Sequence, residues 1–169
     1  ATLATVLCAN LAFAASRDAP ELLRTWQKFS LELVRHTATY SPPVASRTFA
    51  YLGVAGFEAT ASGSPHLKSL AGQLNGLSPL PQREAGVTYD EGIVLNSALA
   101  AVVTELFNNT GPTGQRAMQR LTEKLTDEAL DGVAADVAAR SQAYGEMLAE
   151  HVIIWSRQDG GAEIVNMGF

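Results

Sequence analysis

The sequence has very little cysteine and little charge. Cys8 is the single cysteine among 169 residues, which excludes an internal disulfide framework and a zinc site built from cysteines. Charged residues make up 17% of the chain, below the usual proportion of about a quarter. The formal net charge is −5 and basic residues do not cluster, so the chain has no electrostatic footprint for nucleic acid. We therefore expect no nucleic-acid partner.

The first sixteen residues, ATLATVLCANLAFAAS, contain no charge at all. This stretch is too short for a stable membrane span, which needs roughly 20 apolar residues. Ala12, Phe13 and Ala14 fit the small-x-small pattern that precedes a secretory cleavage site, although an initiator methionine and a basic leading region are missing. We expect residues 1–16 to be a partial signal peptide of a periplasmic or secreted protein. A buried N-terminal helix is the alternative.

Helical periodicity dominates the chain after this segment. Residues 20–39 repeat apolar side chains at three- and four-residue steps, as in an amphipathic helix: Leu22, Leu23, Trp26, Phe29, Leu33 and Val34. Ser41, Pro42 and Pro43 then force a break, because the residue before a proline is disfavoured in the α region. We expect Ser41 to cap a second helix that has Pro42 in its first turn.

The second helix, residues 42–61, is apolar on nearly all sides, which is typical of a buried helix. Gly53 and Gly56 lower helix stability, so we interpret both as places where a neighbouring helix approaches closely. Arg47 and Glu58 lie about three turns apart and share a face. Each needs a partner elsewhere if it is buried.

The remaining chain continues the helical pattern. The elements expected are a short helix over 65–74, a loop over 75–87, a helix over 88–107 with Thr88 and Glu91 as a capping box, a polar amphipathic helix over 113–125, and a long helix over 128–156. We therefore predict one all-α domain over residues 17–161, a bundle of about five to six helices, followed by a tail over residues 162–169.

Metal-binding patterns of helical bundles are not matched. Such sites use Glu-x-x-His pairs on facing helices. Glu32 and His36 are spaced four residues apart, and Glu150 and His151 are adjacent, so neither pair has the required spacing. A surface or interface role for both histidines is the better interpretation, and we expect no metal site.

Nucleophilic and phosphate-binding patterns are equally weak. The segment from Ser62 to His66 contains serine and histidine, but it lacks a strand-turn-helix setting and a carboxylate to orient the histidine. The glycine pairs at 53–56 and 160–161 follow no strand and carry no lysine, so they are not phosphate loops. Aromatic residues at helical spacing are expected in the core: Trp26, Phe29, Tyr40, Phe49, Tyr51 and Phe57. No catalytic or cofactor-binding residue is expected.

The stretch ELVRHTATYSPPVASRTFAYLGVAGFEA resembles the N-terminal helical region of the type 2 phosphatidic acid phosphatase and vanadium-dependent haloperoxidase-like superfamily. The resemblance rests on Trp26, Pro42, Pro43, Val44, Ala45, Arg47, Phe49, Ala50, Tyr51, Glu58 and Ala59. The later segment IIWSRQDGG, from Ile153 to Gly161, also looks like the end of a long helix in that family. Together these segments cover most of the chain, with a gap through the loop near residues 62–87.

The resemblance implies an anion site in which a lysine and two arginines hold phosphate or vanadate beside two histidines. None of its three signature pieces can be placed in this sequence. No lysine is followed at the proper spacing by Arg-Pro, Ser62 and Gly63 are not followed by histidine, and Ser156 and Arg157 have no histidine downstream.

The chain is therefore expected to be the N-terminal scaffold portion of an exported enzyme, with the missing C-terminal catalytic half as its partner. By itself it is expected to lack catalytic, cofactor-binding and metal residues, so vanadate would belong to the full-length protein. The sequence does not decide between phosphoric-ester hydrolysis and peroxide-dependent halide oxidation, and it leaves a homo-oligomer open. The alternative is a stand-alone, non-enzymatic helical binding or assembly module.

Overall fold

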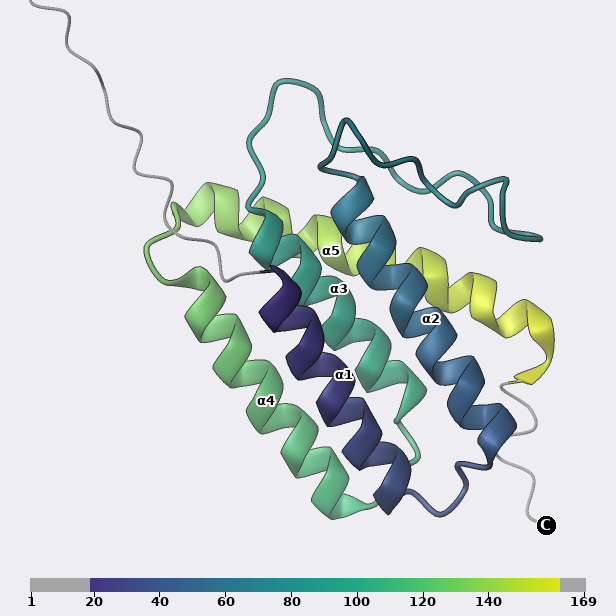
Figure 1. Cartoon of the computed structure of the whole chain (residues 1–169). Helices are drawn as coiled ribbons and strands as arrows, with labels where there is room; N and C mark the ends of the chain where they lie inside the picture. The colour runs from purple at the N-terminus through teal and green to yellow at the C-terminus, as the bar shows by residue number, and fades with distance from the viewer. Residues whose placement is uncertain (1–18, 162–169) are drawn as a thin grey trace, which may run out of the picture.

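The computed structural model describes residues 19–161, and within this range the chain is all-α, as predicted (Figure 1). The elements are α1 (Ala19–His36), α2 (Pro42–Ala61), α3 (Glu91–Leu106), α4 (Pro112–Leu130), α5 (Ala135–Ser156) and a short 3₁₀ helix η1 (Arg157–Asp159). None of these helices is both long and apolar enough to cross a membrane. The expected signal peptide over residues 1–16 and the tail over residues 162–169 lie outside the described part of the chain.

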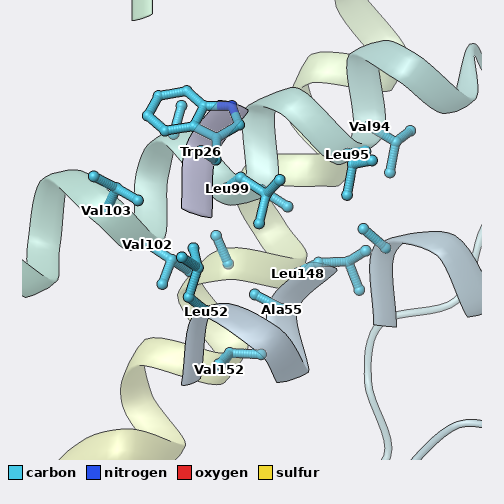
Figure 2. Close-up of a cluster of buried hydrophobic side chains, with 14 of the residues drawn as sticks. Trp26, Leu52, Ala55, Val94, Leu95, Leu99, Val102, Val103, Leu148 and Val152 are labelled. Atoms are coloured by element: carbon cyan, nitrogen blue, oxygen red, sulfur yellow. The ribbon is translucent and has the colours of Figure 1, made fainter. Parts of the chain in front are cut away.

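Helix α3 forms the centre of the bundle. It packs against α1, α2, α4 and α5, and its residues from 92 to 104 carry no charge. Figure 2 shows Trp26 of α1, Leu52 of α2 and Leu148 of α5 gathered around Leu99 and Val102 of α3, and all five side chains are buried. Each fully buried aliphatic side chain contributes about 1.5–3 kcal/mol relative to exposure. The other helices are therefore held chiefly through α3.

Helix α5 lies close against α3 where the two helices cross. A methyl group added at Gly145 would lie 2.5 Å from the carbonyl oxygen of Val94 and 2.8 Å from Cβ of Ser97. The prediction for Gly56 is confirmed, because a methyl group there would meet Leu23 of α1 at 3.2 Å and Leu99 of α3 at 3.4 Å. The prediction for Gly53 is wrong within residues 19–161, since none of their atoms lies within 4 Å of a methyl group added there.

The predicted helix over 42–61 is confirmed at both ends, but Ser41 occupies the cap position without a side-chain hydrogen bond. The first helix ends at His36 and not near Thr39. The prediction of one continuous helix over 128–156 is wrong. The fourth helix runs on to Leu130 and a turn then separates it from α5, because Gly132 adopts a left-handed φ of +74° that ends the helix.

The segment between α2 and α3 contains no helix, so the predicted short helix over 65–74 is wrong. Its turns use Gly72 and Gly76 at φ values of +73° and +75°, a left-handed conformation that glycine adopts without steric cost. The predicted capping box is also wrong. The Asp90 side chain caps α3 by accepting a 2.9 Å hydrogen bond from the backbone N–H of Ile93.

Two glycine substitutions are expected to change the free energy of unfolding in opposite directions. Gly145→Ala should destabilise the chain by about 1–3 kcal/mol, because the added methyl group would clash with α3. Gly53→Ala should stabilise it by up to about 1 kcal/mol, because alanine is the better helix former and the site has room. Urea unfolding followed by circular dichroism measures both values, and destabilisation by both substitutions would contradict the packing described for Gly53.

Candidate functional site

Arg83 ties the long α2–α3 loop to the bundle. Its guanidinium donates two hydrogen bonds, of 2.5 and 2.7 Å, to the carboxylate of Glu91 at the start of α3. It also donates to Oγ of Ser62 at 3.0 Å and lies 5.1 and 5.4 Å from the ring centroids of Tyr89 and Tyr144. Bidentate pairing and cation–π contacts both favour arginine here. We call these five residues the loop cluster, and its role is structural.

A second arginine ties α2 to the end of α5. Arg47 donates from Nε to the Asp159 carboxylate at 2.7 Å and from its terminal nitrogen to the carbonyl oxygen of Ser156 at 2.6 Å. The Tyr51 hydroxyl donates to the same Asp159 oxygen at 2.7 Å, and the Tyr51 ring meets Trp155 edge-on at 5.1 Å. Arg47, Tyr51, Trp155 and Asp159 form what we call the exit cluster, because it lies where the chain leaves the C-terminal end of α5.

The exit cluster shifts the ionisation of two of its members. Burial alone would raise the pKa of Asp159, but the hydrogen bonds from Arg47 and Tyr51 outweigh it, so the pKa is lowered. The pKa of Tyr51 is raised to about 12, first by burial and then by its hydrogen bond to the Asp159 carboxylate. At neutral pH the cluster therefore contains a charged guanidinium, a charged carboxylate and a neutral phenol.

The expectation that Arg47 and Glu58 find partners outside α2 is confirmed. Arg47 pairs with Asp159, 112 residues later in the sequence. Glu58 is only 3% exposed, and its carboxylate accepts a 2.6 Å hydrogen bond from the backbone N–H of Leu70. Glu58 thus anchors the first part of the α2–α3 loop, while Arg83 anchors its last part.

The three histidines lie on three different segments. His36, at the end of α1, is exposed and lies 3.8 Å from the Glu32 carboxylate. His151 on α5 shares a 3.2 Å hydrogen bond with Oγ of Ser78, and His66 is exposed in the α2–α3 loop. Within residues 19–161 no group of three or more histidine, cysteine or acidic residues is placed to hold a metal.

Ser62 belongs to the loop cluster and is not paired with His66. Its hydroxyl donates to the carbonyl oxygen of Ala59 at 2.8 Å and accepts hydrogen bonds from Arg83. The Ser64 hydroxyl accepts a bond from the backbone N–H of His66 at 3.3 Å, as in a turn. The segment from Ser62 to His66 therefore serves to end α2 and begin the loop.

A pocket of about 410 Å³ opens between the end of α1 and the start of α4. Its polar side chains include Glu32 and His36, which already approach each other, and Thr113 near the start of α4. The other side chains that line it are mainly apolar, among them Phe29, Leu33 and Ala117. One imidazole beside one carboxylate does not supply the cationic donors that an oxyanion needs.

The described residues do not fit the vanadate or phosphate cradle that the resemblance implies. Such a cradle needs several cationic donors and imidazoles facing one space. Here Arg47, Arg83 and Arg140 are each bound to a carboxylate, of Asp159, Glu91 and Asp136 respectively. The histidines lie on separate segments, as described above. Residues 19–161 therefore do not by themselves form a site for oxyanion chemistry.

Sequence reasoning missed the loop cluster and the partner of Arg47. Arg83 and Glu84 are the only charged residues between Lys68 and Asp90, which was a usable signal that this arginine has a fixed partner. Asp159 lies in the segment from Ile153 to Gly161, whose pattern indicates only the end of a helix and no partner for Arg47. The aromatic interpretation holds for Trp26, which is fully buried and donates from its indole N–H to Oδ1 of Asn96 at 3.0 Å.

Comparison with solved structures gives one informative match. The chain is similar to the crystal structure described as the first bacterial vanadium-dependent iodoperoxidase, with 31% sequence identity and a TM-score of 0.69. The match covers 88% of this chain but only 35% of the iodoperoxidase chain, so the chain spans about a third of that protein's length. No protein-family model and no curated protein matches the chain.

Removing the guanidinium of Arg83 is expected to destabilise the bundle. Arg83→Ala should lower the free energy of unfolding by about 1–3 kcal/mol, because Glu91 loses a bidentate partner and two tyrosine rings lose a cation. Arg120→Ala, at an exposed position on α4, is the matched control and should change it by less than about 0.5 kcal/mol. Urea unfolding measures both, and equal effects would show that the loop cluster does not stabilise the fold.

The lowered pKa of Asp159 predicts a specific pH dependence. The carboxylate stabilises the folded chain at pH values above its ordinary pKa, and this contribution is lost as pH falls through the lowered value. Asp159→Asn should therefore be less stable than wild type at pH 7, and the difference should shrink on acidification below about pH 4. A difference in urea midpoint that stays constant down to pH 2 would contradict the assignment.

Proposed function

We propose that this chain is the N-terminal helical scaffold of a longer enzyme related to vanadium-dependent haloperoxidases and type 2 phosphatidic acid phosphatases. The observation that carries the proposal is the 31% identity and TM-score of 0.69 to a bacterial vanadium-dependent iodoperoxidase over 88% of the chain. The sequence around Pro42, Pro43 and Arg47 resembles the same superfamily and so supports the same relationship. Within this pattern, Arg47 has a structural role, because it joins α2 to the end of α5.

Peroxide-dependent halide oxidation is the activity we favour for the longer protein, because the similar structure is an iodoperoxidase. Phosphoric-ester hydrolysis is the second candidate, supported by the wider superfamily resemblance. Both reactions need an oxyanion cradle, which the described residues do not fit. We infer that the cradle is supplied by the part of the protein that corresponds to the remaining two-thirds of the iodoperoxidase chain.

We also propose that the enzyme is exported to the periplasm or secreted. The support is the uncharged stretch over residues 1–16, with small residues at Ala12 and Ala14 before a cleavage point. Mass spectrometry of the protein recovered from the producing cells tests this, because cleavage after Ala14 removes residues 1–14 and leaves Ala15 as the first residue. Recovery of an uncleaved protein from the cytoplasm would contradict it.

The test of the enzymatic proposal uses the full product of the gene that encodes this chain. Stripped of oxyanions and then supplied with vanadate, it should oxidise iodide in the presence of hydrogen peroxide, measured as triiodide absorbance. Hydrolysis of p-nitrophenyl phosphate without vanadate would instead indicate the phosphatase activity.

The 169-residue chain is the control and should show neither activity with or without vanadate. Turnover by this chain would overturn the scaffold proposal. Absence of both activities from the full gene product would contradict the enzymatic proposal and favour a non-enzymatic binding or assembly module.

A further inference from the structure

The outward face of α2 differs from the outward faces of α1 and α4. The exposed residues of α2 are Pro42, Pro43, Ser46, Ala50, Gly53 and Thr60, and none of them is charged. By contrast, α1 exposes Glu21, Arg24, Lys28, Glu32 and Arg35, and α4 exposes Arg116, Arg120, Glu123, Lys124 and Asp127. The solvent-facing sides of α1 and α4 are thus typical of a water-exposed surface, whereas that of α2 is not.

The residues on this face follow the spacing of a helix-pairing seam. Positions 43, 46, 50, 53, 57 and 60 alternate steps of three and four residues, which places them along one line of the helix. We call Pro43, Ser46, Ala50, Gly53, Phe57 and Thr60 the α2 seam. This spacing is the one at which a second helix packs at a shallow crossing angle.

Gly53 lies near the middle of the α2 seam, and among the described residues no atom lies within 4 Å of a methyl group added there. Glycine in an exposed helix interior lowers helix stability, and nothing in the described residues compensates for that loss. Ala50, three residues earlier, is also small and exposed. Small residues at the centre of a seam allow the backbone of a second helix to approach closely, which would explain a glycine at this position.

An apolar groove adjoins the α2 seam where α2 faces α1. It has a volume of about 290 Å³ and is lined by Gln27, Leu31, Phe49, Leu52 and Gly53. Leu31 is 49% exposed, which makes it one of the large apolar side chains that this bundle leaves in water. A single large side chain from a helix on the seam would fill this groove and cover Leu31.

We propose that the α2 seam and the adjoining groove are the docking surface for an amphipathic helix supplied by the polypeptide that follows this chain in the longer enzyme. The inference rests on the proposed function for the existence of that polypeptide. The occupant is an uncharged helix face with small residues at its centre and one large apolar side chain for the groove. A charge on that face would be buried without a partner, at a large desolvation cost.

The exit of the described chain supports this occupant. Gly161 donates from its backbone N–H to Asp159 at 2.8 Å, and an added methyl group at Gly161 would touch Arg47 near the start of α2. The described residues therefore end beside the first turns of α2. This chain corresponds to only 35% of the iodoperoxidase chain, so a related longer protein would have ample polypeptide to form the docking helix.

The experiment is thiol labelling of the full gene product in a Cys8→Ser background. Ala50→Cys places a thiol on the α2 seam, and Gln119→Cys places one on the charged outward face of α4 as the matched control. Ser46→Cys repeats the measurement one turn earlier on the seam. Peptide mapping by mass spectrometry gives the labelling rate at each position, normalised to the rate in the urea-unfolded protein.

The seam thiols should label at least about tenfold more slowly than the α4 thiol, because labelling then requires opening of the interface. Equal normalised rates at the seam and control positions would overturn the proposal. Protection that disappears as an oligomer dissociates on dilution would also overturn it, and would assign the seam to a second copy of the chain. A reading frame that stops at Phe169 would remove the occupant altogether.

The labelling result is independent of turnover. A protein with a protected seam and no halide oxidation or phosphatase activity would keep the docking surface and contradict the proposed function. An active protein with a freely labelled seam would support the proposed function and overturn the docking surface.

Discussion

Enclosure of α3 by the other helices is the constraint on which the bundle depends. Its uncharged middle can be buried on every side only if the polar groups that enter the core find partners. Asn96 is the clearest case, because it accepts the indole N–H of Trp26 and so satisfies two buried polar groups from two helices at once. Gly145 also helps to enclose α3, because the absence of a side chain lets α5 lie directly against the α3 backbone. The amphipathic helices α1 and α4 then need only one apolar stripe each.

The buried and half-buried charged residues of this apolar bundle hold its loop and its helix ends in place through hydrogen bonds and ion pairs. Arg83 and Glu58 secure the two ends of a long loop that has no helix of its own, and Arg47 secures the end of α5 to α2. A guanidinium already bound to a carboxylate is a poor anion ligand, because its donors and its charge are engaged. In the described part of the chain the half-buried arginines Arg47 and Arg83 thus hold the helices and the loop in place, which is what the proposed scaffold role requires.

Local sequence signals predicted the fold class and the second helix well, and they failed where a single residue decided the outcome. Ser41, Pro42 and Pro43 restrict the backbone directly, so the start of α2 followed from steric rules. Gly132 lies inside an otherwise helical pattern, and its left-handed conformation was not distinguishable from a tolerated helix glycine. The partner of Arg47 lies 112 residues away, and no periodicity links two such positions. Gly53 and Gly56 gave the same local signal for a close helix approach, yet among the described residues only Gly56 has such a neighbour.

The exit cluster holds the chain up to Gly161 against α2. A helix tethered to a fixed point close to its binding surface meets that surface at an effective concentration of the order of millimolar. Because the association is intramolecular, even a shallow surface with a weak intrinsic affinity, such as the outward face of α2, would suffice to hold the docking helix. The hydrogen bonds of Arg47 and Tyr51 to Asp159 would then lower the entropic cost of that association, in addition to stabilising this bundle.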